Sequence, residues 1–196
     1  MKQHTRIGHI DCVRRKSRML VDRDGRLRKD WVELAGNGAP TLQILLDEGV
    51  LPSPHGARFV GVDLDAGVIK EATALYGEDA PVTWVHGNMV SIIEADIEAF
   101  PNAGVLVFDS WNAARGRDIE QILPILFNFA RKREQQYGEF FLILNVSLKF
   151  VEKGAHRYRS MVEQLFEAHI PEAAWVTYRS SPTSNQMLLT RLRFGF

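Results

Sequence analysis

Cysteine is almost absent from this sequence, and the usual marks of export or membrane insertion are missing too. The 196 residues contain one cysteine, Cys12, which excludes an internal disulfide. No apolar run approaches the roughly 20 residues that a membrane-spanning helix needs. The N-terminal stretch MKQHTRIGHI also lacks the apolar core of a secretory signal. We therefore expect a cytoplasmic protein without a membrane segment.

The sequence has no excess of charge of either sign. With 24 basic and 24 acidic side chains, it generates no net field that would attract nucleic acid or an anionic membrane. Basic residues nevertheless gather at Arg14, Arg15, Lys16 and Arg18, where a solvated surface and a nucleic-acid contact are both open interpretations. A second basic cluster, at 131–133, is expected to complement the end of a helix.

Two common site patterns are missing as well. The histidines show no metal-ligand spacing, and Cys12 has no second cysteine, so we expect no metal. The dinucleotide fingerprint G-x-G-x-x-G is incomplete, because Thr41 stands where a third glycine would follow Gly36 and Gly38. A nicotinamide cofactor is therefore disfavoured.

What the sequence does contain is an alternation of strand-like and helix-like segments. Near-continuous apolar runs are typical of strands in a parallel sheet that is covered on both faces. These runs occupy residues 31–35, 57–63, 82–86, 104–109 and 139–148. Two further strand-like segments, 173–181 and 186–194, are separated only by a turn, which predicts an antiparallel pair. We expect an α/β fold: a three-layer Rossmann-like sandwich with a seven-stranded, mostly parallel sheet and an antiparallel C-terminal strand.

Helix signals lie between the strand-like segments. Apolar residues recur at helical spacing within 66–76, where Asp65 is placed to cap the start and Gly77 to cap the end. The same spacing recurs in 156–170. Another helix should either start or kink at Pro124.

The first 30 residues form a basic segment that differs from the rest of the chain. Within it, RMLVDRDGRLR has an Asp24-Gly25 turn signal between short apolar runs, which predicts a small β-hairpin. We therefore divide the chain into an N-terminal segment, 1–30, and an α/β domain, 31–196.

A glycine turn and an acidic residue suggest a ligand site. In WVELAGNGAP, a strand enters a Gly-Asn-Gly turn, and Pro40 suits the first turn of a helix. Such a turn points backbone N–H groups and a positive helix end at a ligand. Asp63 ends the next strand, where a carboxylate can accept hydrogen bonds from the ribose hydroxyls of a nucleoside cofactor.

These segments resemble class I S-adenosylmethionine-dependent methyltransferases. The resemblance rests on WVELAGNGAPTLQILL, FVGVDLDAGVIKEATALYG, VTWVHGNM and GVLVFDSWN, and it extends over roughly residues 31–196. It implies S-adenosylmethionine as the cofactor. The residues that it implies as cofactor-binding are Glu33, Ala35, Gly36, Asn37, Gly38, Asp63, Leu64, Asn88 and Met89. Asp109, Trp111 and Asn112 would contact the acceptor, and Asp109 would orient or deprotonate it.

Three functions remain open from the sequence. The first is methyl transfer to an unidentified acceptor. The second is a catalytically inactive binding or adaptor protein, because Ala35, Asn37 and Ala39 occupy positions where the family usually has glycine. The third is a nucleic-acid methyltransferase that uses the basic N-terminal segment. The DSWN sequence at 109–112 and the lack of a Pro-Cys pair disfavour methylation of DNA amino groups and of cytosine C5.

Overall fold

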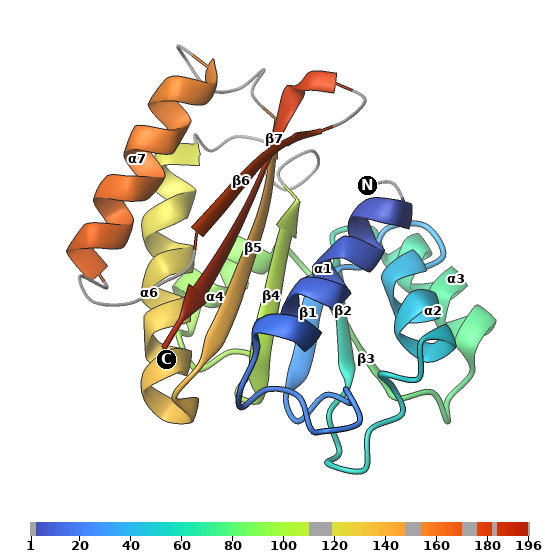
Figure 1. Ribbon diagram of the computed structural model, residues 1–196. Helices are drawn as coiled ribbons and strands as arrows, with labels where there is room; N and C mark the ends of the chain where they lie inside the picture. Colours follow the sequence, from blue (N-terminus) through green and yellow to red (C-terminus); the bar gives the residue numbers. More distant parts are fainter. Residues whose placement is uncertain (1–2, 110–118, 148–153, 170–175, 182–183, 196) are drawn as a thin grey trace. The chain divides into compact units, whose positions relative to one another are not determined.

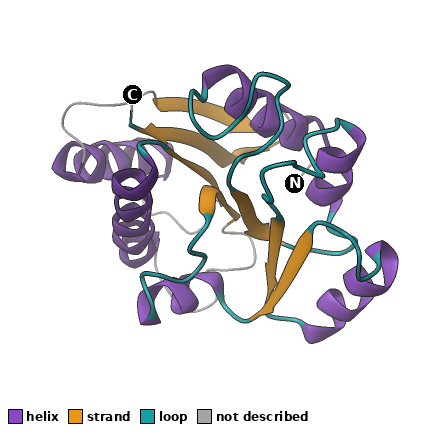
Figure 2. Ribbon diagram, turned by 90° about the horizontal axis from the view of Figure 1, so that it is seen from below, coloured by secondary structure: helices purple, strands orange, loops and turns teal. Residues whose placement is uncertain are grey.

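The chain forms two compact units. Figure 1 labels their helices and strands. A computed structural model describes residues 3–109, 119–147, 154–169, 176–181 and 184–195. Unit 1 consists of Met1–Met89 and Phe100–Leu106, and unit 2 consists of Val90–Ala99 and Val107–Phe196. Figure 2 distinguishes the helices, strands and loops of the chain by colour.

Unit 1 alternates helices and strands after an N-terminal helix. Its elements are α1 (Gln3–Lys16), β1 (Asp30–Leu34), α2 (Pro40–Asp47), β2 (Phe59–Asp63), α3 (Ala66–Tyr76), β3 (Val82–His86) and the first part of β4 (Ala103–Asp109). β1 pairs in parallel with β2, and β2 pairs in parallel with β3. The strands therefore lie where the apolar runs predict them, and these three are parallel as expected.

One face of these three strands is covered by α2 and α3. Glu33, Gly61 and Trp84 lie side by side in the strand register and so point to the same face. Thr41 of α2 donates a hydrogen bond to Glu33, and Tyr76 of α3 packs against the Trp84 ring. Both helices therefore pack on the face that carries Glu33 and Trp84.

The N-terminal segment differs from its prediction. Residues Gln3–Lys16 form helix α1, which contacts α2, and its buried residues are His9, Ile10, Cys12 and Val13. The predicted hairpin is reduced to a single antiparallel bridge between Val21 and Leu27, with Gly25 at φ +79° in the turn. Asp22 closes this turn by accepting hydrogen bonds from the N–H groups of Arg26 and Asp24, and the bond from Arg26 above all lowers the Asp22 pKa. The hydrogen bonds to Asp22 thus form the turn although no pair of strands flanks it.

Unit 2 contains most of α4 (Met89–Ala95), the end of β4, and the C-terminal elements. These elements are α6 (Ile119–Tyr137), β5 (Phe140–Ser147), α7 (Gly154–His169), β6 (Val176–Ser181) and β7 (Ser184–Phe194). β7 runs antiparallel to both β5 and β6, which confirms the predicted C-terminal pair. Pro124 lies inside α6, so the helix does not start there.

Phenylalanine side chains form much of the core of unit 2. The Phe127 ring of α6 lies edge-on to Phe194 of β7, with 5.8 Å between ring centroids. Phe140 of β5 contacts Phe194 in the same manner, as does Phe166 of α7. Edge-to-face pairs at this spacing stabilise beyond the area that they bury. They hold α6 and α7, which lie side by side in Figure 1, against β5 and β7.

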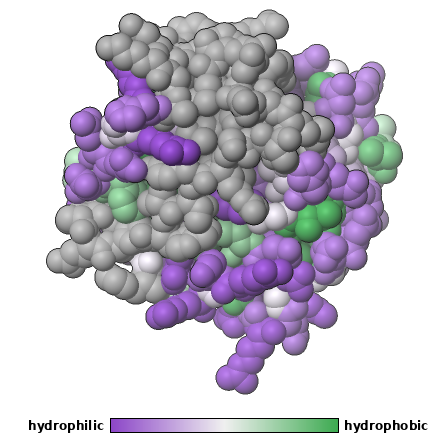
Figure 3. Space-filling view, turned by 45° about the horizontal axis from the view of Figure 1, so that its top comes forward, coloured by the Kyte–Doolittle hydropathy of each residue, from purple (hydrophilic) through white to green (hydrophobic). Residues whose placement is uncertain are grey.

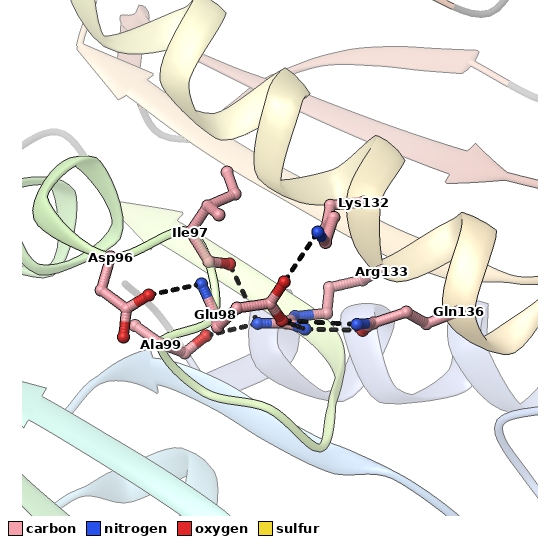
Figure 4. Close-up of polar contacts among 7 residues, drawn as sticks. All are labelled: Asp96, Ile97, Glu98, Ala99, Lys132, Arg133 and Gln136. Carbon is pink, nitrogen blue, oxygen red and sulfur yellow. Dashed lines mark hydrogen bonds and ion pairs between the residues drawn. The ribbon is translucent and has the colours of Figure 1, made fainter.

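A buried arginine joins α6 to the segment that precedes β4 (Figure 4). The Arg133 side chain is 0% exposed, and its Nη2 donates to the carbonyl oxygens of Ile97 and Ala99 at 3.0 and 2.8 Å. Its Nη1 donates to Glu98 Oε2 at 3.1 Å, and Lys132 approaches Glu98 Oε1 at 2.7 Å. Hydrogen bonds from Lys132 and then Arg133 lower the pKa of Glu98 to about 2. We call this group the Arg133 clasp; its members are Ile97, Glu98, Ala99, Lys132, Arg133 and Gln136.

Within unit 1 the strand order is β3-β2-β1, and within unit 2 it is β5-β7-β6. The predicted α/β fold with parallel strands and an antiparallel C-terminal strand is therefore confirmed. None of the described helices is long and apolar enough to cross a membrane. On the face shown in Figure 3, the described surface is mostly hydrophilic, and its hydrophobic residues stand apart from one another.

Candidate functional site

The turn between β1 and α2 has an unusual backbone. Gly36, Gly38 and Ala39 have φ values of +58°, +70° and +39°, a region that side chains with a Cβ disfavour. A Cβ added at Gly36 or Gly38 would have no described atom within 4 Å. The backbone of the turn is thus open on the side where these two glycines lack side chains.

Asp63 fixes the start of this turn from the end of β2. Its Oδ2 accepts a hydrogen bond from the Gly36 N–H at 3.1 Å, and its Oδ1 accepts one from the Asp65 N–H at 2.9 Å. Each carboxylate oxygen has a further lone pair, so Asp63 can accept additional hydrogen bonds. The structure therefore brings together the glycine turn and the acidic residue that the sequence singles out.

The two residues that follow Asp63 differ: Asp65 caps a helix, whereas Leu64 is exposed. Asp65 accepts a hydrogen bond from the Gly67 N–H at 2.7 Å and caps α3, as predicted. Leu64, by contrast, is 53% exposed although it is apolar. His86 at the end of β3 contacts the Leu64 carbonyl oxygen through Nε2 at 3.0 Å. Leu64 therefore presents an exposed apolar side chain at the position that follows Asp63.

Glu33 is buried beneath the turn. It is 4% exposed, and its carboxylate accepts hydrogen bonds from Trp31 Nε1 and Thr41 Oγ1, both at 2.9 Å. The Thr41 bond connects β1 to the first turn of α2, and the Trp31 bond lies within β1. Ala35 is also buried, and its N–H donates to the Val62 carbonyl oxygen at 2.9 Å. Asn37, between the two glycines, is exposed.

Tyr76, at the end of α3, contacts the same turn and was missed in the sequence. Its hydroxyl lies 2.9 Å from the Gly38 carbonyl oxygen and 3.2 Å from that of Ala39. Burial, and then the nearby Asp47 carboxylate, raise the Tyr76 pKa, so the hydroxyl stays protonated at neutral pH. In the sequence, Tyr76 is indistinguishable from an ordinary apolar position of an amphipathic helix.

Two further predicted cofactor residues follow β3. Asn88 is half-buried, and Met89 is fully buried at the start of α4. The turn, Asp63, Leu64 and these two residues all belong to unit 1.

Asp109, the first of the predicted acceptor residues, belongs to unit 2. Asp109 ends β4 and is half-buried, and its Oδ2 accepts a hydrogen bond from Asn145 Nδ2 of β5 at 3.1 Å. Asn145 itself is buried. Trp111 and Asn112 lie outside the described residues. The Asp109–Asn145 bond orients the carboxylate at the carboxyl ends of two strands.

Arg14 and Arg15, near the N-terminus, have acidic partners within unit 1. Arg14 lies 3.7 Å from Glu48, and Arg15 lies 3.6 Å from Asp11 one helical turn away. Lys16 and Arg18 are exposed. Among the described residues, no group of three or more histidine, cysteine or acidic side chains could hold a metal ion.

No family model and no curated protein matches the sequence, but several solved structures have the same fold. A candidate rRNA methylase from Clostridium thermocellum has a TM-score of 0.59 at 9% identity and covers 98% of this chain and 97% of its own. The precorrin-6y C5,15-methyltransferase of Geobacter metallireducens has a TM-score of 0.56 at 12% identity, with 99% and 90% covered.

A third similar structure was solved with a ligand. Aeropyrum pernix fibrillarin, in complex with natively bound S-adenosyl-L-methionine, has a TM-score of 0.50 at 9% identity and covers 85% of this chain and 67% of its own. At such identities the likeness concerns the fold alone. The chain has the fold of class I S-adenosylmethionine-dependent methyltransferases.

Proposed function

We propose that this protein binds S-adenosylmethionine at the turn after β1 and transfers its methyl group to an acceptor. The observation that carries the proposal is the hydrogen bond between the Gly36 N–H and Asp63 Oδ2. This bond connects a glycine turn, which is open to a ligand, to the Asp63 carboxylate, which can still accept hydrogen bonds. A nucleoside that carries a cationic sulfonium and an amino acid part suits this combination.

The residues of unit 1 fit such a cofactor in their chemistry. Gly36 and Gly38 leave room for a ligand to approach the backbone, which a Cβ at either position would fill. Asp63 would accept hydrogen bonds from the ribose hydroxyls, and the exposed Leu64 would contact the adenine. Asn88 would bind the adenine edge, with Met89 packed behind it. Bound S-adenosylmethionine would supply an electrophilic methyl group.

The remaining predicted residues would act on the backbone of unit 1 or on the acceptor. Glu33, through Trp31 and Thr41, would hold β1 and α2 in the positions that shape the turn from Ala35 onward. We assign Asp109 the task of orienting the acceptor or removing its proton, with Asn145 fixing the carboxylate. Trp111 and Asn112 remain proposed acceptor contacts.

Calorimetric titration with S-adenosylmethionine and S-adenosylhomocysteine tests this proposal. We expect binding by the wild-type protein and a loss of roughly 10- to 100-fold in affinity for Asp63→Ala, because hydrogen bonds to a charged group are removed. Asp79→Ala is the matched control, since Asp79 is an exposed aspartate in the loop before β3. A folded wild-type protein that binds neither compound would refute the proposal and favour the inactive binding protein.

Nucleic acid is a second candidate for the acceptor. The observation that favours it is a run of exposed cations in unit 1: Arg15, Lys16, Arg18, Arg23, Arg26 and Arg28. Fluorescence anisotropy with a labelled RNA at several salt concentrations tests it. Replacing Arg15, Lys16 and Arg18 by glutamine should weaken binding and flatten its dependence on salt. If RNA does not bind at low salt, this candidate is excluded.

A further inference from the structure

The Tyr76 hydroxyl bridges two successive carbonyl groups of the turn between β1 and α2. It lies 2.9 Å from the oxygen of Gly38 and 3.2 Å from the oxygen of Ala39. A phenol has a single proton to donate, so the two carbonyl oxygens share it. Both must point toward the end of α3 for this contact to exist, which restricts the backbone of the turn at the residue before α2.

This restriction matters because Ala39 adopts a backbone conformation that suits glycine. Its φ and ψ of 39° and 58° are left-handed, and its methyl group is fully buried. Alanine also has no side-chain acceptor for the first N–H groups of α2. Those of Leu42 and Gln43 donate to the Ala39 carbonyl oxygen instead, at 3.0 and 3.4 Å. The geometry at Ala39 therefore needs support from outside the turn.

A chain of contacts with the sheet fixes Tyr76 in place, so that it can support Ala39. Its ring packs against Trp84 of β3, with 6.5 Å between centroids, and the Trp84 ring lies across Gly61 of β2. A Cβ at Gly61 would lie only 2.3 Å from the Trp84 ring, so only glycine admits the ring there. Phe59 contacts the same ring edge-on at 6.2 Å. Tyr76 is thus held by the sheet, not only by its own helix.

We propose that Tyr76 is a positioning residue for S-adenosylmethionine, and this inference rests on the function proposed above. The turn is fixed at two points: Asp63 holds Gly36, and Tyr76 holds Gly38 and Ala39. Between these points lies the backbone that is open to a ligand. Tyr76 compensates for an alanine at a left-handed position, and so keeps a turn without the usual glycine in the shape that receives the cofactor.

Two measurements on Tyr76→Phe test this role. The substitution removes the hydroxyl and keeps the ring on Trp84. Hydrogen exchange in the ligand-free protein should become about 3- to 10-fold faster at the N–H groups of Ala39 and Gln43, as expected for the loss of a neutral hydrogen bond. The exchange of the Val60 N–H in β2 should stay unchanged. Calorimetry with S-adenosylmethionine should give a Kd weakened by a similar factor.

The controls separate a local role from a general loss of stability. Leu75→Ala changes the neighbouring position of α3, where the side chain is 65% exposed, and should alter neither quantity. Unchanged exchange at Ala39 and Gln43 would overturn the contact itself. Faster exchange with an unchanged Kd would overturn its role in binding. If the wild-type protein binds no S-adenosylmethionine, the proposed function fails together with this role, and the wild-type titration identifies that case.

Discussion

Replacing Arg133 by methionine should destabilise the protein far more than replacing its neighbour Lys132. Both side chains pair with Glu98, but Arg133 is 0% exposed and Lys132 is 42% exposed. Methionine fills much of the space of the arginine stem and removes its donors. The carbonyl groups of Ile97 and Ala99 then lose their charged partner.

The magnitude follows from these two carbonyl bonds. A hydrogen bond to a charged group contributes about 1.5 kcal/mol at the lower end of its range, which gives about 3 kcal/mol for Arg133→Met. In a chain of this size, each kcal/mol corresponds to roughly 2–4 °C in Tm, so we expect a decrease of about 6–12 °C. Lys132→Met removes only a solvated ion pair and should lower the free energy of unfolding by less than ~1 kcal/mol.

Urea denaturation of the two variants, followed by circular dichroism, measures both free energies. Added salt should reduce the small contribution of Lys132 and leave the effect of Arg133→Met largely unchanged, because buried bonds are poorly screened. Equal losses for the two variants would refute the reasoning, as would a loss below ~1 kcal/mol for Arg133→Met. Either result would mean that burial does not decide the strength of the Arg133 clasp.

Three further predictions concern single positions. The lowered pKa of Glu98 gives stability that is present above pH 4.5 and is lost as the pH falls toward about 2, so Glu98→Gln should flatten the pH dependence of unfolding in that window. Gly61→Ala should cost about 1–3 kcal/mol through its clash with the Trp84 ring, and much of this loss should vanish in a Trp84→Leu background. Asp65→Ala should lower the free energy of unfolding by ~1 kcal/mol in thermal melts, because the Gly67 N–H loses its cap; no change would mean that water replaces the carboxylate.

The sequence predicts the strands well because their signal is local. Apolar runs between turn residues place β3 at the bounds that the structure has, and β1, β2, β4 and β5 within two residues of theirs. Asp65 and Gly77 also act through bonds to nearby backbone, and both cap α3 as expected. These features need no knowledge of what packs against them.

Features that depend on distant partners could not be predicted. Helix α1 has few apolar residues, so its sequence resembles a solvated basic segment although Ile10 and Val13 are buried. The basic cluster at 131–133 was expected to mark a helix end, but α6 continues to Tyr137 and Arg133 points into the protein. Its carbonyl partners at 97 and 99 lie more than thirty positions away. No local sequence pattern predicts hydrogen bonds between such distant residues.

In the candidate site, too, the local sequence predicts some residues, and only the fold reveals others. Gly36, Gly38 and Asp63 stand out in the sequence because their residue types and their place after strands suit a ligand. Tyr76 acts through a side chain that reaches 37 and 38 positions back along the chain, and only the fold brings it to the turn. The division of the chain at residue 30 stays a prediction, as does the third layer of the sandwich.

The position of β7 between β5 and β6 has a consequence for synthesis of the chain. β6 leaves the ribosome before β7, yet β7 is its partner in the sheet. Until residues 184–194 have emerged, β6 has no neighbour and the side of β5 that will receive β7 is an open edge. β1, β2 and β3 are complete about a hundred residues earlier. During translation, the interval just before β7 emerges therefore leaves the nascent protein open to edge-to-edge aggregation.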